Sequence, residues 1–210
     1  MSGRAGFTLL EMLVAVGSAL FILAAVGGFA RAESRMIDRE CRRLRVTEAN
    51  RRVLDMITRE LKGAGFAPVS GGFDGAADGL AVAERTRIEV RSDLHGTTAG
   101  DPPDGVLDVD SDERVGFVLN AARGLVSESI GRQVLPLTLE SAVPADGLWF
   151  RYFDACGEEI VPATGTELAA AERARVRSVT VHLTTRAAGG DAVGGEVTST
   201  LRNRQGLRCE

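Results

Sequence analysis

The sequence predicts an α+β fold: a long N-terminal helix, transmembrane in its first half, packed on an antiparallel β-sheet. An apolar run over residues 7–30, in which Glu11 is the only formal charge, predicts the transmembrane part. Hydrophobic side chains then recur every three or four residues, and no Pro or Gly interrupts residues 29–62, which predicts an amphipathic continuation. After residue 80 the period becomes alternating, with Gly, Pro and Asp between short apolar stretches, as is typical of β-strands.

The apolar run raises the question of why it contains an acid. As a helix, residues 7–30 would be roughly 36 Å long, which spans a bilayer. A carboxylate in lipid costs at least about 2.5 kcal/mol, so Glu11 needs an explanation. A cleaved secretory signal ending at Ala30-Arg31-Ala32 is one alternative, but the apolar run is longer than the usual signal core and contains an acid. An ordinary uncleaved anchor is another, and it gives Glu11 no role.

The stretch GFTLLEMLVA, which starts at Gly6, resembles the N-terminal signature of type IV pilins and of the pseudopilins of type II secretion. The resemblance implies that a prepilin peptidase removes residues 1–6 as a leader by cutting between Gly6 and Phe7. It also implies methylation of the new N-terminal amine on Phe7. Glu11 would then be the fifth residue of the mature chain and would meet the α-amine of a neighbouring subunit, so that its charge is paired on assembly.

The chain divides into segments along these lines. We expect residues 7–32 to be the transmembrane segment and residues 33–64 its amphipathic continuation, in one helix of about 55 residues. Gly63, Gly65 and Pro68 should end it with a left-handed cap and a helix breaker. A Gly-rich linker over residues 65–79 leads into an extracytoplasmic β-rich domain, residues 80–210. Within it we predict strands at 87–90, 115–119, 148–153, 176–185 and 196–201, and a short helix at 167–175.

Nearly the whole chain resembles minor pilins of the PilW kind and, more loosely, the J-type minor pseudopilins of type II secretion, although only the first eleven residues are highly specific. This similarity rests on RRVLDMITRELKGAGF, GLWFRYFDACGEEI and RSVTVHLTTR. It implies a pilin-like fold and a non-catalytic subunit for initiation or tip assembly of a type IV pilus, with a type II secretion pseudopilin as the alternative. The expected partners are other pilins or pseudopilins through the N-terminal helix, the prepilin peptidase and the membrane. The expected location is the bacterial inner membrane, crossed once with the N-terminus cytoplasmic and the C-terminal domain periplasmic, and later the pilus.

Arginines that follow the apolar run favour the opposite orientation by the positive-inside rule. They are Arg31, Arg35, Arg39, Arg42, Arg43 and Arg45. We keep the orientation that the leader requires, because the peptidase acts on the cytoplasmic side and long domains translocate despite their charge. Acidic residues are interspersed, so we interpret the arginines as a solvated helix face with ion pairs four residues apart.

An acidic loop between two predicted strands is a candidate calcium site. Its possible ligands are Asp93, Asp101, Asp104, Asp108, Asp110 and Asp112, followed by Glu113. Calcium takes six to eight oxygen ligands from flexible loops. The spacing departs from that of an EF-hand, so solvated loop acids are the favoured interpretation, with calcium as the only cofactor considered.

The three cysteines show no zinc-site spacing. Cys156 and Cys209 both fall in the predicted extracytoplasmic domain, where oxidation is permitted, and are a candidate disulfide pair. Cys41 lies on the apolar stripe of the helix and is expected to be a small buried side chain.

Catalysis has little support in the sequence. There is no GxSxG, HExxH, Walker or GxGxxG motif, and neither His95 nor His182 falls in a triad order. We therefore expect no enzyme. The formal net charge of −4 also argues against a nucleic-acid partner. A membrane-anchored extracytoplasmic binding domain or enzyme is the alternative from another functional class.

Overall fold

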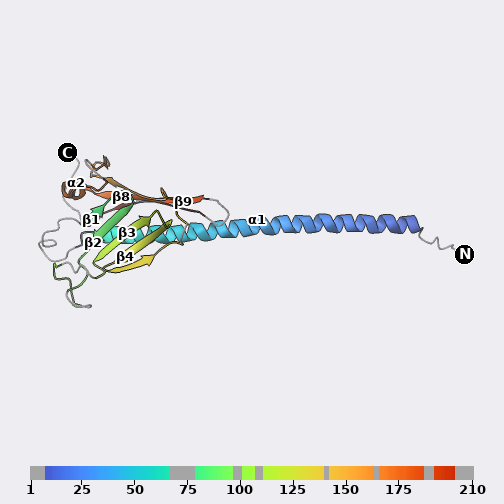
Figure 1. Cartoon of the computed structure of the whole chain (residues 1–210), viewed down its shortest axis with the longest axis horizontal. Coiled ribbons are helices and arrows are strands. Elements are labelled where there is room, and N and C mark those ends of the chain that lie inside the picture. Colours follow the sequence, from blue (N-terminus) through green and yellow to red (C-terminus); the bar gives the residue numbers. More distant parts are fainter. Residues whose placement is uncertain are drawn as a thin grey trace. The chain divides into compact units, whose positions relative to one another are not determined.

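A computed structural model describes residues 8–66, 79–96, 101–106, 111–139, 142–162, 166–186 and 192–201. The chain forms two compact units, Met1–Leu44 and Arg45–Glu210. Helix α1 (Leu9–Gly63, 55 residues) contributes its first part to one unit and its second part to the other (Figure 1). The predicted long N-terminal helix is therefore confirmed.

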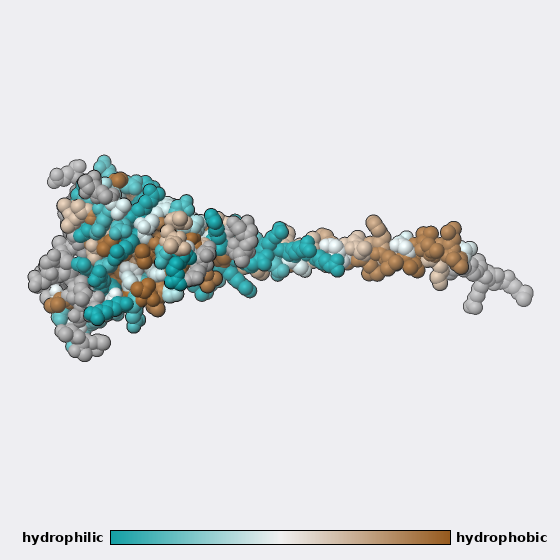
Figure 2. All heavy atoms as spheres, viewed as in Figure 1, coloured by the Kyte–Doolittle hydropathy of each residue, from teal (hydrophilic) through white to brown (hydrophobic). Residues whose placement is uncertain are grey.

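In the first unit, no side chain of α1 from Leu9 to Leu44 is buried. Even large apolar side chains are open, with Leu9 83% and Phe21 77% exposed. The helix is long and apolar enough to cross a membrane, and Figure 2 shows its hydrophobic side chains giving way to hydrophilic ones further along. A helix that is hydrophobic all round needs lipid or protein against it, so this part of α1 has the surface of a membrane anchor.

In the second unit, α1 becomes amphipathic. Its buried residues are Asn50, Val53, Leu54, Ile57 and Leu61, which recur at three- and four-residue spacing. The helix ends as expected: Gly65 has a positive φ of 76°, and the amide of Phe66 bonds the carbonyl of Gly63 at 3.0 Å. Glycine adopts this left-handed conformation without steric cost. Pro68 lies outside the described residues.

Among the described residues the strands form two antiparallel sheets, whereas the sequence suggested one. The first has the order β1 (Leu80–Ala83), β2 (Arg87–Arg91), β3 (Arg114–Asn120), β4 (Leu125–Ile130) and β5 (Gln133–Pro136). The second has the order β7 (Glu159–Ile160), β6 (Leu148–Phe153), β8 (Ser178–Arg186) and β9 (Ala192–Thr200), with the short helix α2 (Ala170–Arg175) before β8. The predicted α+β class with antiparallel pairing is confirmed.

The core of the second unit is a hydrophobic cluster shared by α1 and both sheets. Ile57 and Leu61 of α1 are completely buried in it, together with Phe117 of β3 and Leu183 of β8. As predicted, Val179, Val181 and Leu183 alternate on the buried face of β8.

The two sheets meet at the turn between β1 and β2. There the amide of Phe150 bonds the carbonyl of Arg85 at 2.8 Å, and the hydroxyl of Tyr152 donates to the carbonyl of Glu84 at 2.6 Å. Burial raises the pKa of the Tyr152 phenol well above its ordinary value, so the phenol stays protonated and remains a donor.

Candidate functional site

The start of α1 holds Glu11 in a defined arrangement. Its Oε2 atom accepts hydrogen bonds from the backbone amide and from the hydroxyl of Thr8, each at 3.0 Å. In return, the Oγ1 atom of Thr8 accepts from the backbone amide of Glu11 at 3.3 Å. This reciprocal pairing is a capping box, in which a threonine before the helix and a glutamate three residues later satisfy each other's free amides.

The capping box changes how the lone acid is understood. Glu11 supplies a negative charge at the positive end of the helix dipole, so it has a structural role in the chain by itself. The sequence interpretation missed this, although the threonine three residues before the glutamate in TLLE is the signal that predicts it. Within the described part of the chain, no hydrogen bond to the Oε1 atom of Glu11 is found. Gly6 and Phe7, the predicted cleavage and methylation residues, lie outside the described residues.

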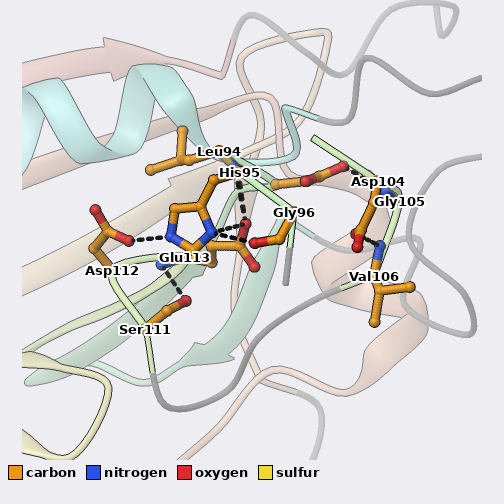
Figure 3. Close-up of polar contacts among 10 residues, drawn as sticks. Leu94, His95, Gly96, Asp104, Gly105, Val106, Ser111, Asp112 and Glu113 are labelled. Atoms are coloured by element: carbon orange, nitrogen blue, oxygen red, sulfur yellow. Dashed lines mark hydrogen bonds and ion pairs between the residues drawn. The ribbon is translucent and has the colours of Figure 1, made fainter. Parts of the chain in front are cut away.

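The acidic loop is organised around His95, as Figure 3 shows. The Nδ1 atom of His95 lies 2.9 Å from the carbonyl oxygen of Gly96, and its Nε2 atom lies 2.8 Å from the Oδ1 atom of Asp112. Both neighbours are acceptors, so both bonds form only when the ring is doubly protonated. The hydrogen bonds to Gly96 and Asp112 raise the pKa of the imidazole.

Two buried carboxylates hold the backbone of the same loop. Glu113 is completely buried, and its Oε1 atom accepts from the amides of Leu94 and His95 at 2.9 and 3.1 Å. Asp93 is also completely buried, and its Oδ2 atom accepts from the amide of Gly105 at 2.9 Å. These carboxylates accept hydrogen bonds from loop amides that have no backbone partner among the described residues.

Calcium coordination stays a prediction. Four of the proposed ligands, Asp93, Asp101, Asp104 and Asp112, are described, and Asp108 and Asp110 lie outside the described residues. Within the described ranges, no group of three or more His, Cys, Asp or Glu side chains could hold a metal ion. The Oδ1 atom of Asp104 accepts from the amide of Val106 at 2.8 Å, so this carboxylate also supports the loop backbone.

The cysteines differ in their states. Cys156 is disulfide-bonded, while Cys209, its predicted partner, lies outside the described residues, so the pairing itself stays a prediction. Cys41 is an exposed free thiol. The expectation that Cys41 is buried is therefore wrong, because the buried stripe of α1 begins only at Asn50.

A second carboxylate pair lies between α1 and β4. Burial raises the pKa of Glu128 in β4. The pKa of Glu60 in α1 is also raised, mainly by burial and to a smaller extent by the nearby charge of Glu128. Glu128 lies opposite Phe117 of β3, and both point to the buried face of the first sheet. A polar side chain therefore occupies a position where a strand of this sheet would ordinarily bury an apolar one.

Trp149, Phe150 and Tyr152 of β6 line an open pocket of about 430 Å³, together with side chains that include Arg85 and Ile160. Trp149 stacks on His182 of β8 with ring centres 4.6 Å apart. The Nε2 atom of His182 lies 2.8 Å from the hydroxyl of Thr184. His182 lies opposite Trp149 in the β6–β8 pair. It is half-buried between the buried Val181 and Leu183, as predicted for a histidine on the sheet surface. The Nδ1 atom of the same ring lies 3.8 Å from the Oε2 atom of Glu196 in β9.

Comparison with known proteins adds no relative, since no family model and no curated protein matches the chain. The architecture, a long apolar N-terminal helix followed by antiparallel sheets, is consistent with a pilin-like fold.

Proposed function

We propose that this protein is a minor pilin, a non-catalytic subunit that takes part in initiation or tip assembly of a type IV pilus. In this proposal α1 crosses the bacterial inner membrane once, with the N-terminus in the cytoplasm and the β-rich unit in the periplasm. A prepilin peptidase cuts between Gly6 and Phe7 and methylates Phe7. The subunit then enters the pilus through helix contacts with other pilins.

The observation that carries the proposal is the placement of Glu11 at the start of an exposed apolar helix. Its Oε2 atom is committed to Thr8, while its Oε1 atom has no hydrogen bond within the described residues. The α-amine of a neighbouring processed subunit can bind at Oε1 without opening the capping box. A charge that is costly in lipid then becomes one half of an ion pair inside a bundle of apolar helices.

The exposed apolar surface supports the same function. Side chains from Leu9 to Phe29 are open all around the helix, so they can contact lipid before assembly and neighbouring helices afterwards. Helices exchange lipid for helix contacts at little hydrophobic cost, because lipid tails are as apolar as leucine. A type II secretion pseudopilin would use the same helix, and it is the alternative within this class.

A membrane-anchored binding domain is the candidate from another class, and the pocket beside Trp149 favours it. The two classes differ in the fate of the N-terminus. Mass spectrometry of the protein purified from a host with a prepilin peptidase should find a chain that begins with methylated Phe7. A host without the peptidase provides the control and should yield the uncut chain. An N-terminus at Met1 in both hosts, or a cut after Ala32, would contradict the pilin assignment.

A further inference from the structure

Four arginines of α1 follow the apolar segment directly and lie on one side of the helix. Arg31, Arg35, Arg39 and Arg42 are separated by four, four and three residues. At about 100° per residue, they fall within an arc of about 80°. We name these four residues the arginine stripe. All of them belong to the first unit, and all are exposed.

The arginine stripe has no partner of its own within the described chain. No hydrogen bond or ion pair joins any of its guanidinium groups to another described residue. Arginines further along the same helix do form ion pairs: Arg51 lies 4.0 Å from Asp55, and Arg52 pairs with Glu48. The expected ion pairs at four-residue spacing therefore form in the second unit. They are not made by the stripe.

Acidic side chains of the same segment lie mostly on the other side of the helix. Glu33 and Glu40 fall about 160° to 180° away from Arg31 and Arg42, at 3.6 residues per turn. Asp38 is the exception, since it falls only about 20° outside the arc, next to Arg31. A helix that separates charges in this way presents a cationic surface in one direction.

The position of the stripe along the helix selects its partner. If residues 7–30 span the hydrocarbon core, Arg31 and Arg35 emerge within the headgroup layer, which adds about 5 to 7 Å on each side. Arg39 and Arg42 lie about 14 to 18 Å beyond the core. Their long side chains can reach back towards the interface, and they still experience the potential of an anionic surface.

We infer that the arginine stripe binds the phosphate groups of anionic lipids in the leaflet where α1 leaves the membrane. Guanidinium groups bind phosphate with paired hydrogen bonds. An arginine near an anionic surface changes binding by about fivefold. The stripe selects phosphatidylglycerol over phosphatidylcholine in the lipid shell around the helix. This inference rests on the membrane-spanning part of the proposed function and is independent of cleavage and of pilus assembly.

The test uses the full chain reconstituted in vesicles of equimolar phosphatidylcholine and phosphatidylglycerol. Electron spin resonance of spin-labelled lipids measures the relative association of each lipid with the protein. The wild type should prefer the labelled phosphatidylglycerol severalfold, and added salt should reduce this preference. The variant Arg31→Gln/Arg35→Gln should lower this preference markedly, with Arg39 and Arg42 retaining a weaker one, while Arg31→Lys/Arg35→Lys should retain most of it.

Arg51→Gln/Arg52→Gln is the matched control, because it removes the same charge from the same helix beyond the reach of the headgroups. It should leave the lipid preference unchanged. Equal association of both lipids with the wild type, or an equal loss in the control, would overturn the inference. Resistance to alkaline extraction reports insertion separately. A chain that fails to insert would refute membrane anchoring itself, whereas an inserted chain without preference refutes only the stripe's role.

Discussion

The side-chain amide of Asn50 joins α1 to the second sheet, and its removal should weaken the β-rich unit strongly. Its Nδ2 atom donates to the carbonyl of Val193 at 2.8 Å, and its Oδ1 atom accepts from the hydroxyl of Thr185 at 2.9 Å. Asn50 is 4% and Thr185 5% exposed. Because water does not reach this site freely, broken hydrogen bonds are not replaced at full value.

The expected cost follows from the two hydrogen bonds. Asn50→Ala removes a bond to the half-buried Val193, worth about 1 kcal/mol, and leaves the buried Thr185 hydroxyl without this partner, which costs about 1–3 kcal/mol. The sum is about 2–4 kcal/mol. This is a large share of the free energy of unfolding of a typical domain, which is roughly 5–15 kcal/mol. Thr185→Val combined with Asn50→Ala should show a coupling free energy of about 1 kcal/mol.

Urea unfolding of the full chain in detergent micelles measures these values. Trp149 is the single tryptophan and lies in β6, which pairs along its length with β8, so its fluorescence reports the second sheet. With a slope of about 2 kcal/mol per molar urea, Asn50→Ala should lower the midpoint by about 1–2 M. Arg51 is exposed and follows Asn50 directly, so Arg51→Ala is the control and should change the free energy of unfolding by less than about 0.5 kcal/mol. A loss below about 1 kcal/mol for Asn50→Ala, or zero coupling with Thr185→Val, would refute the reasoning.

Two further predictions concern the first sheet and its junction with the second. Burial raises the pKa of Glu128, so the folded state holds its proton more tightly, and wild-type stability falls as pH rises through the folded pKa. Glu128→Gln should therefore unfold at a higher temperature than the wild type at pH 7, and this difference should disappear in acid. An equal shift of the thermal midpoint at both pH values would contradict the prediction. Glu158→Gln, at an exposed glutamate, is the control. Tyr152→Phe should cost about 1 kcal/mol in urea unfolding, because it removes the bond to the Glu84 carbonyl. A variant as stable as the wild type would show that the hydroxyl does not tie the sheets together.

The long helix and its end were predictable because local rules determine them. Apolar spacing places Val53, Ile57 and Leu61 on the buried stripe, and a glycine is needed where Gly65 turns left-handed. The strand β8 was equally clear, since Val179, Val181 and Leu183 alternate with polar residues.

The missed strands lack such a pattern. In β4 the residues Ser127, Glu128 and Ser129 interrupt the apolar alternation, although this strand pairs along its length with β3. All residues of β5 are exposed, and β7 has only two residues. Alternation shows which face of a strand is buried but not which strands pair, so the division into two sheets was beyond the reach of periodicity.

The start of β9 was missed for a different reason. Gly194 and Gly195 weaken the strand pattern, yet Gly195 has a packing role. A Cβ atom at this position would lie 3.0 Å from the Cδ1 atom of Leu54 in α1. Glycine allows β9 to approach the helix closely, and that need arises only from the tertiary structure.

Of the candidate site, the sequence indicated Glu11 but not its present partner. The apolar surroundings made the acid conspicuous, while the role of Thr8 required attention to the three-residue spacing of a capping box. The ligation of calcium and the pairing of Cys209 depend on residues outside those described, so both stay predictions.

Incorporation of Glu11 variants into filaments tests the central claim most directly. Cells that express Glu11→Gln should insert the chain and remove its leader normally, because neither step uses the ion pair. Sheared filaments or purified tip complexes should contain far less of this variant than of the wild type, measured by quantitative mass spectrometry. Glu33→Gln, an exposed glutamate of the same helix, and Thr8→Val, which keeps the Glu11 carboxylate, should both be incorporated. Incorporation of Glu11→Gln at the wild-type level would contradict the account.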